Sequence, residues 1–149
     1  MSLRRVPTVL AAAAMLTGGL VATAPAASAT SFSISSANGC TQARFSYTYG
    51  NRTLVAGKYG YTITYSGTVY DSPSCYSDGY GGVIQIRYQH SGGFVWETVG
   101  WSELRRNEDN GSAGFSAVDD AWYDDVHFRV CNRNPRTGTV GTCGTPTGS

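Results

Sequence analysis

Four aspartates lie close together in the segment VDDAWYDDVHFRVC (residues 118–131), and clustered carboxylates can hold calcium or act as a catalytic acid and base. They are Asp119, Asp120, Asp124 and Asp125. A calcium loop needs oxygen ligands at alternating positions and a glycine at its sharp bend, whereas these residues form two adjacent pairs without a glycine between them. The sequence therefore predicts no metal site. We expect the first pair to cap a helical turn over residues 121–123 and the second pair to keep a strand entrance solvated.

Histidine chemistry is also poorly supported, because the chain has only His90 and His127. A serine or cysteine nucleophile needs a histidine base, but no G-x-S-x-G motif is present and we expect every cysteine to be oxidised. Two histidines without Cys or Glu at ligand spacing form no zinc motif. Glu97 and Glu103 could face each other as glycosidase carboxylates do, yet acids are too common for such a pair to carry weight. We predict no catalytic residue, no cofactor and no enzymatic activity.

The aromatic residues point to binding. The chain contains 10 tyrosines and 3 tryptophans, and aromatic rings stack on sugars and anchor protein interfaces. Most tyrosines share strand parity with phenylalanine or isoleucine and are explained as core residues. The aromatic candidates that remain are Trp96, Trp101, Trp122 and Tyr123. Either some of them form an exposed binding patch, or Trp101 and Trp122 close the ends of the fold.

Short runs of alternating apolar and polar residues position these side chains. In YGYTITYSGTV (residues 59–69), apolar side chains alternate with threonine and serine, as in a strand with one buried face. In FVWETVGW (residues 94–101), both faces are apolar, which indicates a strand covered on both sides or one whose outer face meets a partner. Turn signals separate the runs, which predicts an all-β fold, a single antiparallel β-sandwich. We expect strands at residues 32–37, 43–49, 59–70, 82–90, 94–101, 113–118, 125–132 and 138–143.

The N-terminus has the features of a secretory signal peptide: a basic start, an apolar stretch and small residues up to Ala29. We predict a cleaved signal peptide over residues 1–29 and one secreted, extracellular domain over residues 30–149, with no membrane span in the mature chain. Loss of Arg4 and Arg5 leaves nine basic residues against ten acidic ones, a net charge of about −1. Without a clustered positive surface, the domain is not expected to bind nucleic acid.

All four cysteines lie in the predicted mature domain, and an even number in an oxidising compartment predicts two disulfides. Cys131 and Cys143 flank the turn Asn-Pro-Arg-Thr-Gly (residues 134–138), so a hairpin there sets their sulfurs opposite each other. By elimination, Cys40 then pairs with Cys75.

The direction of Cys131 follows from strand parity. If Val126, Phe128 and Val130 face the core, Cys131 points outward. This parity favours a disulfide on the outer face of the hairpin over one buried between two sheets, as in antibody domains.

The final hairpin, VHFRVCNRNPRTGTVGTC, behind an alanine-rich export signal, resembles small secreted β-sandwich proteins of actinomycetes. The resemblance implies export and a β-sandwich fold and carries no catalytic residue across. Some proteins of that kind inhibit hydrolases or serve as adapter subunits of larger secreted assemblies. The expected architecture is immunoglobulin-like, but the chain is not a true immunoglobulin domain, because Arg129 stands where that family has its corner tyrosine.

These features predict a secreted, non-catalytic module that binds another secreted or surface protein, alone or as an adapter in an extracellular assembly. The segment Thr30 to Asn38 is expected to be flexible and to add as a strand to the partner, with Phe32 and Ile34 as anchors. The second interpretation is a carbohydrate- or cell-wall-binding module that uses the tryptophans. The third is an inhibitor of a secreted hydrolase, with residues 132–138 as its exposed loop.

Overall fold

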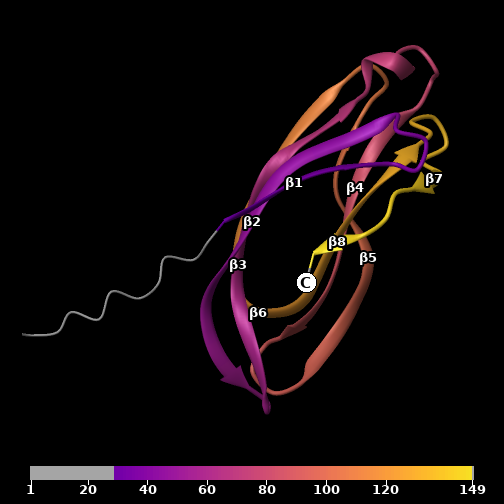
Figure 1. Ribbon diagram of the computed structural model, residues 1–149. Helices are drawn as coiled ribbons and strands as arrows, with labels where there is room; N and C mark the ends of the chain where they lie inside the picture. The colour runs from indigo at the N-terminus through magenta and orange to yellow at the C-terminus, as the bar shows by residue number, and fades with distance from the viewer. Residues whose placement is uncertain (1–28, 149) are drawn as a thin grey trace, which may run out of the picture.

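The computed structural model describes residues 29–148 and, within this range, only the backbone of residues 119 and 120. The regular structure in this range is β-strand, apart from one turn of 3-10 helix, η1 (Pro73–Cys75). Neighbouring strands are antiparallel, as the alternation of apolar and polar residues predicts (Figure 1). The strands are β1 (Thr30–Ser35), β2 (Thr41–Val55), β3 (Lys58–Asp71), β4 (Gly81–Ser91), β5 (Trp96–Asn107), β6 (Ser112–Arg133), β7 (Val140–Cys143) and β8 (Thr147–Gly148).

Two packed layers share one strand, β6. The strand order is β1-β2-β3-β6-β4-β5, and β7 and β8 also pair with β6. The first half of β6 pairs with β3, and its second half pairs with β4, β7 and β8. Tyr123 marks the change, because it lies opposite both Tyr61 of β3 and His90 of β4. One layer thus contains β1, β2, β3 and the start of β6, and the other contains β5, β4 and the rest of β6. The predicted antiparallel sandwich is confirmed.

Strand β6 runs through the segment where a helical turn was expected over residues 121–123, so that prediction was wrong. Irregular pairing absorbs the extra residues: between Asp119 and Tyr123, three residues of β6 face a single residue of β3. A second irregularity lies at Asp125, whose φ of 52° is a left-handed conformation that Asp tolerates. Bulges of this kind bend a strand, and they let β6 pass from one layer to the other.

The hydrophobic core lies between the layers. The ring of Phe128 in β6 lies 4.7 Å from that of Phe45 and 5.4 Å from that of Tyr47, both in β2. Val126, Phe128 and Val130 are each 0% exposed, which confirms the predicted inward face of this strand. Burying a side chain of this size stabilises the fold by about 1.5–3 kcal/mol relative to leaving it in water. The remaining core residues are Ala43, Ile63, Val69, Ile84, Ile86 and Tyr123.

Both predicted disulfides are present, Cys40–Cys75 and Cys131–Cys143. Cys143 of β7 lies directly opposite Cys131 of β6, so this bond joins neighbouring strands and does not cross between the layers. Cys131 lies on the same side of β6 as Arg129, as parity predicts, because both contact Gln85, but the outward-facing residue is covered and is 0% exposed. Its sulfur lies 3.6 Å from Oε1 of Gln85, and the added strand β7 helps to cover it.

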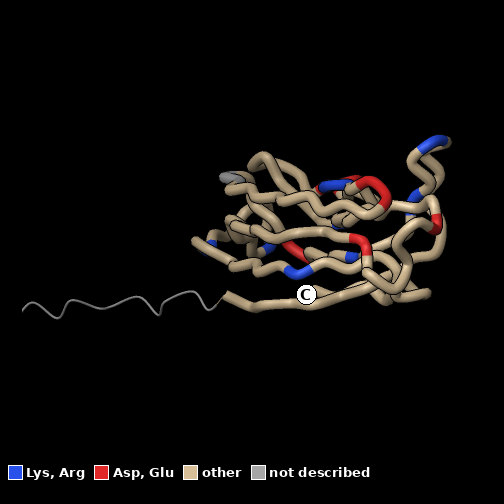
Figure 2. The backbone as a smooth tube through the Cα atoms, turned by 90° about the horizontal axis from the view of Figure 1, so that it is seen from above, with Lys and Arg blue, Asp and Glu red and all other residues tan. Residues whose placement is uncertain are grey.

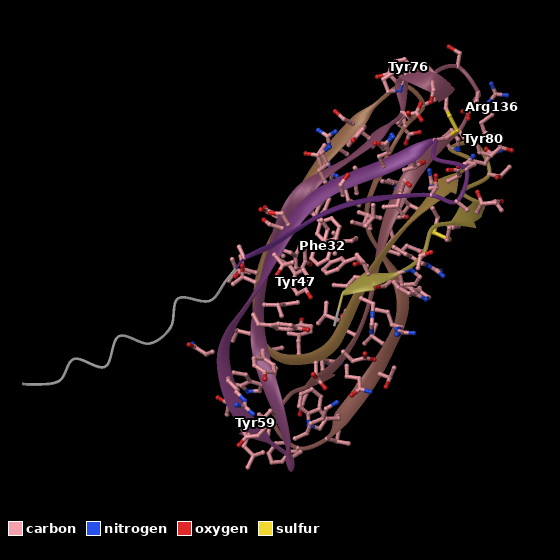
Figure 3. The ribbon with its side chains drawn as sticks, in the orientation of Figure 1. Phe32, Tyr47, Tyr59, Tyr76, Tyr80 and Arg136 are labelled. Carbon is pink, nitrogen blue, oxygen red and sulfur yellow. A yellow bond between two sulfur atoms is a disulfide. The ribbon has the colours of Figure 1, made fainter. Side chains whose placement is uncertain are left out.

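The segment that precedes Cys40 belongs to the fold. Strand β1 pairs with β2 along its whole length, over residues 30–35. A strand was expected here, over residues 32–37, but the flexibility expected of the segment Thr30 to Asn38 was wrong for the paired residues. The ring of Phe32 stacks on those of Phe45 and Tyr47, with both centroid distances 5.4 Å (Figure 3). Its aromatic side chain therefore stabilises the domain itself.

Residues with charged side chains are few and are spread along the described chain (Figure 2). Among residues 29–148, no helix is long and apolar enough to span a membrane. The predicted signal peptide lies outside the described residues except for its last residue, Ala29.

Candidate functional site

Two neighbouring apolar side chains are exposed in the loop between β4 and β5. Phe94 is 96% exposed and Val95 is 61% exposed. Local sequence explains the loop: Ser91 pairs with Trp96 across the hairpin, and Gly93 has a φ of 119° that other residues rarely adopt. The hydroxyl of Ser91 accepts a hydrogen bond from the Gly93 amide at 3.1 Å. The turn is thus held by its own residues while its two large apolar side chains point into solvent.

Trp96 anchors this loop to the neighbouring hairpin between β2 and β3. Its indole Nε1 donates a hydrogen bond to the carbonyl oxygen of Val55 at 2.9 Å. The ammonium of Lys58 lies 5.0 Å from the ring centroid, at cation–π distance. A Cβ on Gly60 would lie 2.9 Å from Cη2 of the indole, so the backbone of β3 passes close beneath the ring. Trp96, predicted as a binding residue, is half-buried and positions the loop.

The hairpin between β2 and β3 exposes further apolar side chains. Leu54 and Tyr59 lie opposite each other across it and are 61% and 49% exposed. Its turn, residues 56–57, has positive φ at both positions, as the tightest hairpin turns require. The guanidinium of Arg52 lies 3.6 Å from the Tyr59 ring centroid. Tyr59 lies at the opposite end of the molecule from Tyr76 (Figure 3). The hairpin-tip surface is defined here as Leu54, Tyr59, Phe94 and Val95.

Other predicted binding residues pack within the fold. Tyr123 is 6% exposed, and its ring lies 5.0 Å from that of Tyr88. Phe32 and Ile34 are half-buried and pack against the core from β1. Trp122 is half-buried beside the backbone of β3. The structure therefore uses Phe32, Ile34 and Tyr123 for packing.

Trp101 lies on the outer face of the second layer, among polar side chains. The guanidinium carbon of Arg129, on β6, is 4.3 Å from its ring centroid, and that of Arg87, on β4, is 5.4 Å away. Because β4 lies between β5 and β6, the indole must reach across β4. Nε of Arg129 donates a hydrogen bond to Oε1 of Gln85 at 2.9 Å. Burial, together with the charge of Arg87, lowers the pKa of Arg129. The Trp101–arginine cluster is defined here as Gln85, Arg87, Trp101 and Arg129.

Both histidines are paired with carboxylates. Nε2 of His127 lies 2.7 Å from Oδ1 of Asp125, and Nε2 of His90 lies 3.6 Å from Oε2 of Glu97. Within residues 29–148, no hydroxyl group is hydrogen-bonded to either ring, and every cysteine is in a disulfide. A nucleophile needs a base within hydrogen-bonding distance, so these residues do not form a nucleophile and base pair.

One carboxylate is buried near the connection between the layers. Asp71 is 2% exposed, and its Oδ2 accepts a hydrogen bond from the amide of Asn110 at 3.1 Å. Burial raises the pKa of Asp71, and the hydrogen bond from Asn110 opposes that rise. The turn at residues 109–111 joins β5 to β6, which do not pair with each other. Through this hydrogen bond, Asp71 at the end of β3 holds the turn between β5 and β6 in place.

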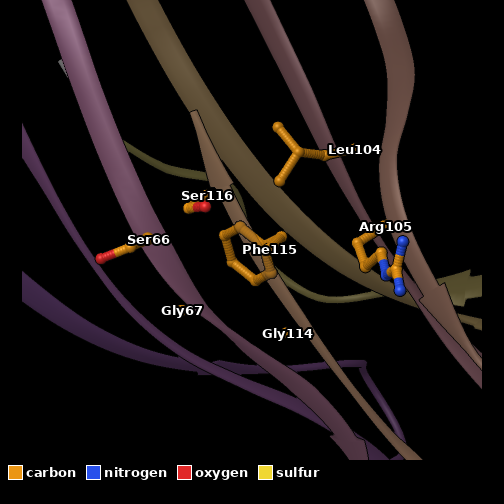
Figure 4. Close-up of a pocket in the computed structure, with 7 residues that line it drawn as sticks. All are labelled: Ser66, Gly67, Leu104, Arg105, Gly114, Phe115 and Ser116. Carbon is orange, nitrogen blue, oxygen red and sulfur yellow. The ribbon is translucent and has the colours of Figure 1, made fainter. Parts of the chain in front are cut away.

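A groove of about 590 Å³ lies between β5 and the first half of β6 (Figure 4). Its lining residues are Ser66, Gly67, Leu104, Arg105, Gly114, Phe115 and Ser116. The groove follows from the topology, because in the described chain β5 pairs only with β4 and the first half of β6 pairs only with β3. Arg105 is the one charged residue in the lining, so the groove does not bring together an acid and a base.

The hairpin between β6 and β7 contains the predicted inhibitory loop, residues 132–138. Its turn is folded on itself: the Gly138 amide donates to the Asn134 carbonyl at 2.8 Å, and the Arg136 amide donates to Oδ1 of Asn134 at 2.9 Å. An extended segment suits binding in another protein's groove, and this turn does not offer one. The geometry therefore lends no support to the inhibitor interpretation.

No model of a known protein family matches the chain, and no curated protein matches it significantly. The geometry of the described residues singles out two candidate sites, the hairpin-tip surface and the Trp101–arginine cluster.

The sequence run FVWETVGW signalled the hairpin tip through its two apolar faces. The residues singled out in it were Trp96 and Trp101, whereas the structure exposes Phe94 and Val95. A strand was expected from residue 94, directly after the glycine pair, but β5 begins at Trp96, so Phe94 and Val95 belong to the loop. The Trp101–arginine cluster had no such signal, since Arg129 on β6 is far in sequence from β4 and β5 and joins them only through the strand order.

Proposed function

We propose that this chain is an exported, non-catalytic binding module that attaches to another secreted or surface protein through the hairpin-tip surface. The observation that carries the proposal is the 96% exposure of Phe94 beside Val95, on a turn that is held by its own hydrogen bond. Burying such a side chain against a partner is worth about 1.5–3 kcal/mol, whereas in the monomer it contributes little. A preorganised loop also loses little conformational entropy on binding.

Export is supported by the two disulfides, which persist in oxidising compartments, and by the signal-peptide features of residues 1–29. A protein partner is favoured over a lipid surface because charges of both signs flank the tip. Arg52 lies against Tyr59, and the exposed Glu97 follows Val95 in the same hairpin. Apolar residues ringed by mixed charges are typical of protein interfaces.

The test compares three immobilised proteins: the wild type, the tip variant Phe94→Ser/Val95→Ser, and the control Val118→Ser. Val118 is 76% exposed on β6 and belongs to neither hairpin tip. Each protein is incubated with culture filtrate and surface extract of the producing organism, and the retained proteins are quantified by mass spectrometry. A true partner is retained by the wild type and the control and lost by the tip variant. With the purified partner, calorimetry should then give an affinity roughly tenfold or more lower for the tip variant.

Equal retention by all three proteins would show that the hairpin-tip surface is not used. Binding of the wild type, but not of the tip variant, to vesicles of phosphatidylcholine and phosphatidylglycerol would assign the surface to lipid instead. Sedimentation analysis separates a third outcome, in which the tip joins two copies of this chain.

A further inference from the structure

Three planar side chains meet in the Trp101–arginine cluster on the outer face of the second layer. The guanidinium carbons of Arg129 and Arg87 lie 4.3 Å and 5.4 Å from the centroid of the indole. Each of the three residues comes from a different strand, with β4 between β5 and β6. Paired strands, and not a loop, therefore hold the cluster in place.

The two arginines retain hydrogen-bond donors without acceptors. Nε of Arg87 is buried and has no hydrogen-bond partner within residues 29–148. Arg129 uses its Nε for Gln85, and in the same part of the chain neither of its terminal nitrogens is hydrogen-bonded. The terminal nitrogens of Arg129 are not among the buried unpaired atoms, so an acceptor supplied from outside can reach them, whereas the buried Nε of Arg87 cannot be reached directly.

The nearest carboxylate leaves the cluster with an excess of positive charge. Oδ2 of Asp125 lies 4.0 Å from Nη2 of Arg87, beyond hydrogen-bonding distance, and its Oδ1 is taken up by His127 at 2.7 Å. The pKa of Arg129 is lowered by burial and then by the neighbouring charge of Arg87. An anion placed between the two guanidinium groups would relieve this repulsion.

We infer that the Trp101–arginine cluster binds the carboxylate of a uronic acid unit in an acidic polysaccharide. A guanidinium group presents two parallel N–H donors in one plane, which match the two oxygens of a carboxylate. Both guanidinium groups lie against the indole, and the part of this half-buried ring that they leave exposed adds an apolar contact that a sugar ring would use and a simple inorganic anion would not. This site is separate from the hairpin-tip surface and does not depend on the proposed protein partner.

The experiment is an NMR titration of the isotope-labelled protein with a short oligogalacturonate. The control ligand is the same oligosaccharide with its carboxylates methyl-esterified, which removes the charge and keeps the sugar rings. The expected result is saturable shifts of the Trp101 indole N–H and of the Arg87 and Arg129 side-chain N–H signals with the acid, and none with the ester. Arg129→Gln and Arg87→Gln should each weaken binding roughly tenfold or more.

Arg136→Gln is the matched control variant, because Arg136 is exposed in the turn before β7, and it should bind like the wild type. Arg129→Lys keeps the charge without the paired donors and should also bind more weakly if the carboxylate is held by both donors. Phe94→Ser/Val95→Ser should bind the oligosaccharide normally, which separates this site from the proposed protein-binding surface.

Several results would overturn the inference. Equal binding of the methyl ester would show that the carboxylate is not recognised. Chemical-shift changes centred on other residues would show that the oligosaccharide does not bind at the Trp101–arginine cluster. A glutamate-rich peptide that shifts the same signals with higher affinity than the oligosaccharide would reassign the cluster to a protein carboxylate. The wild-type shift map decides between these outcomes even if a charge-removing variant fails to fold.

Discussion

The indole nitrogen of Trp96 donates a hydrogen bond to the backbone carbonyl of Val55, 2.9 Å away. Val55 ends β2 in the first layer, and Trp96 begins β5 in the second. The bond therefore ties the layers together at one end of the sandwich. It also holds the two hairpins of the hairpin-tip surface in a fixed relation.

Trp96→Phe should lower the free energy of unfolding by about 1–2 kcal/mol, because it removes this hydrogen bond and part of the packing on Gly60. Urea denaturation measures the loss, and amide exchange should quicken in the β2–β3 hairpin. Trp101→Phe is the control, since no indole hydrogen bond of Trp101 is present in the described chain. An equal or larger cost for the Trp101 variant would contradict the role assigned to Trp96.

Phe94 and Phe128 should respond in opposite ways to truncation. Phe94 is 96% exposed, so Phe94→Ala should change the free energy of unfolding by no more than about 0.5 kcal/mol. Phe128 is 0% exposed between the layers, and Phe128→Ala should cost about 3–5 kcal/mol. Denaturant titrations of both variants test this contrast. A marked loss of stability in the Phe94 variant would mean that its ring packs within the domain.

The two disulfides should differ in their contributions to stability. Cys40 and Cys75 are 35 residues apart, whereas Cys131 and Cys143 are 12 apart. On the chain-entropy account, the larger loop gives about 4 kcal/mol and the smaller about 3 kcal/mol. The double variants Cys40→Ala/Cys75→Ala and Cys131→Ala/Cys143→Ala can be compared by denaturant titration. If removing the Cys131–Cys143 bond cost more, the packing of the buried Cys131 would contribute more to stability than the size of the closed loop.

Ionisation of the Asp71 carboxyl should lower the free energy of unfolding as the pH rises from acid to neutral. Burial raises the pKa of Asp71 in the folded protein, so the folded state holds this proton more tightly than the unfolded chain, where the pKa of aspartate is about 3.9. Its favourable contribution is complete below that value and is lost as the pH rises through the folded pKa.

The variant that tests this is Asp71→Asn, which keeps an oxygen for the Asn110 amide but cannot ionise. Its Tm relative to the wild type should increase between about pH 3 and pH 7, as followed by circular dichroism. Glu108→Gln, at an exposed glutamate, should show a much smaller trend. A relative Tm that falls with rising pH would contradict the raised pKa.

The alternation of side-chain direction along each strand accounts for the parts of the fold that were predictable from the sequence. The alternation of Val126, Phe128 and Val130 identified the buried face of β6, because the direction of side chains along a strand depends only on position. The turn between Cys131 and Cys143 identified one disulfide, and the other followed by elimination.

The course of β6 through its aspartates was not predictable in this way. Aspartate is disfavoured in strands, and here its backbone is accommodated by irregular pairing with β3 and β4, including the positive φ of Asp125. The role of Trp96 was equally hidden, because its hydrogen-bonding partner is 41 residues away in sequence. Contacts of this kind depend on the strand order, in which β6 enters between β3 and β4.

The shared strand β6 also determines how the domain should melt. If either layer opened alone, one half of β6 would lose its neighbours and leave a row of backbone donors and acceptors unpaired. The layers should therefore denature as a single cooperative unit. In scanning calorimetry, the enthalpy obtained from the area of the peak should equal the van't Hoff enthalpy obtained from its shape.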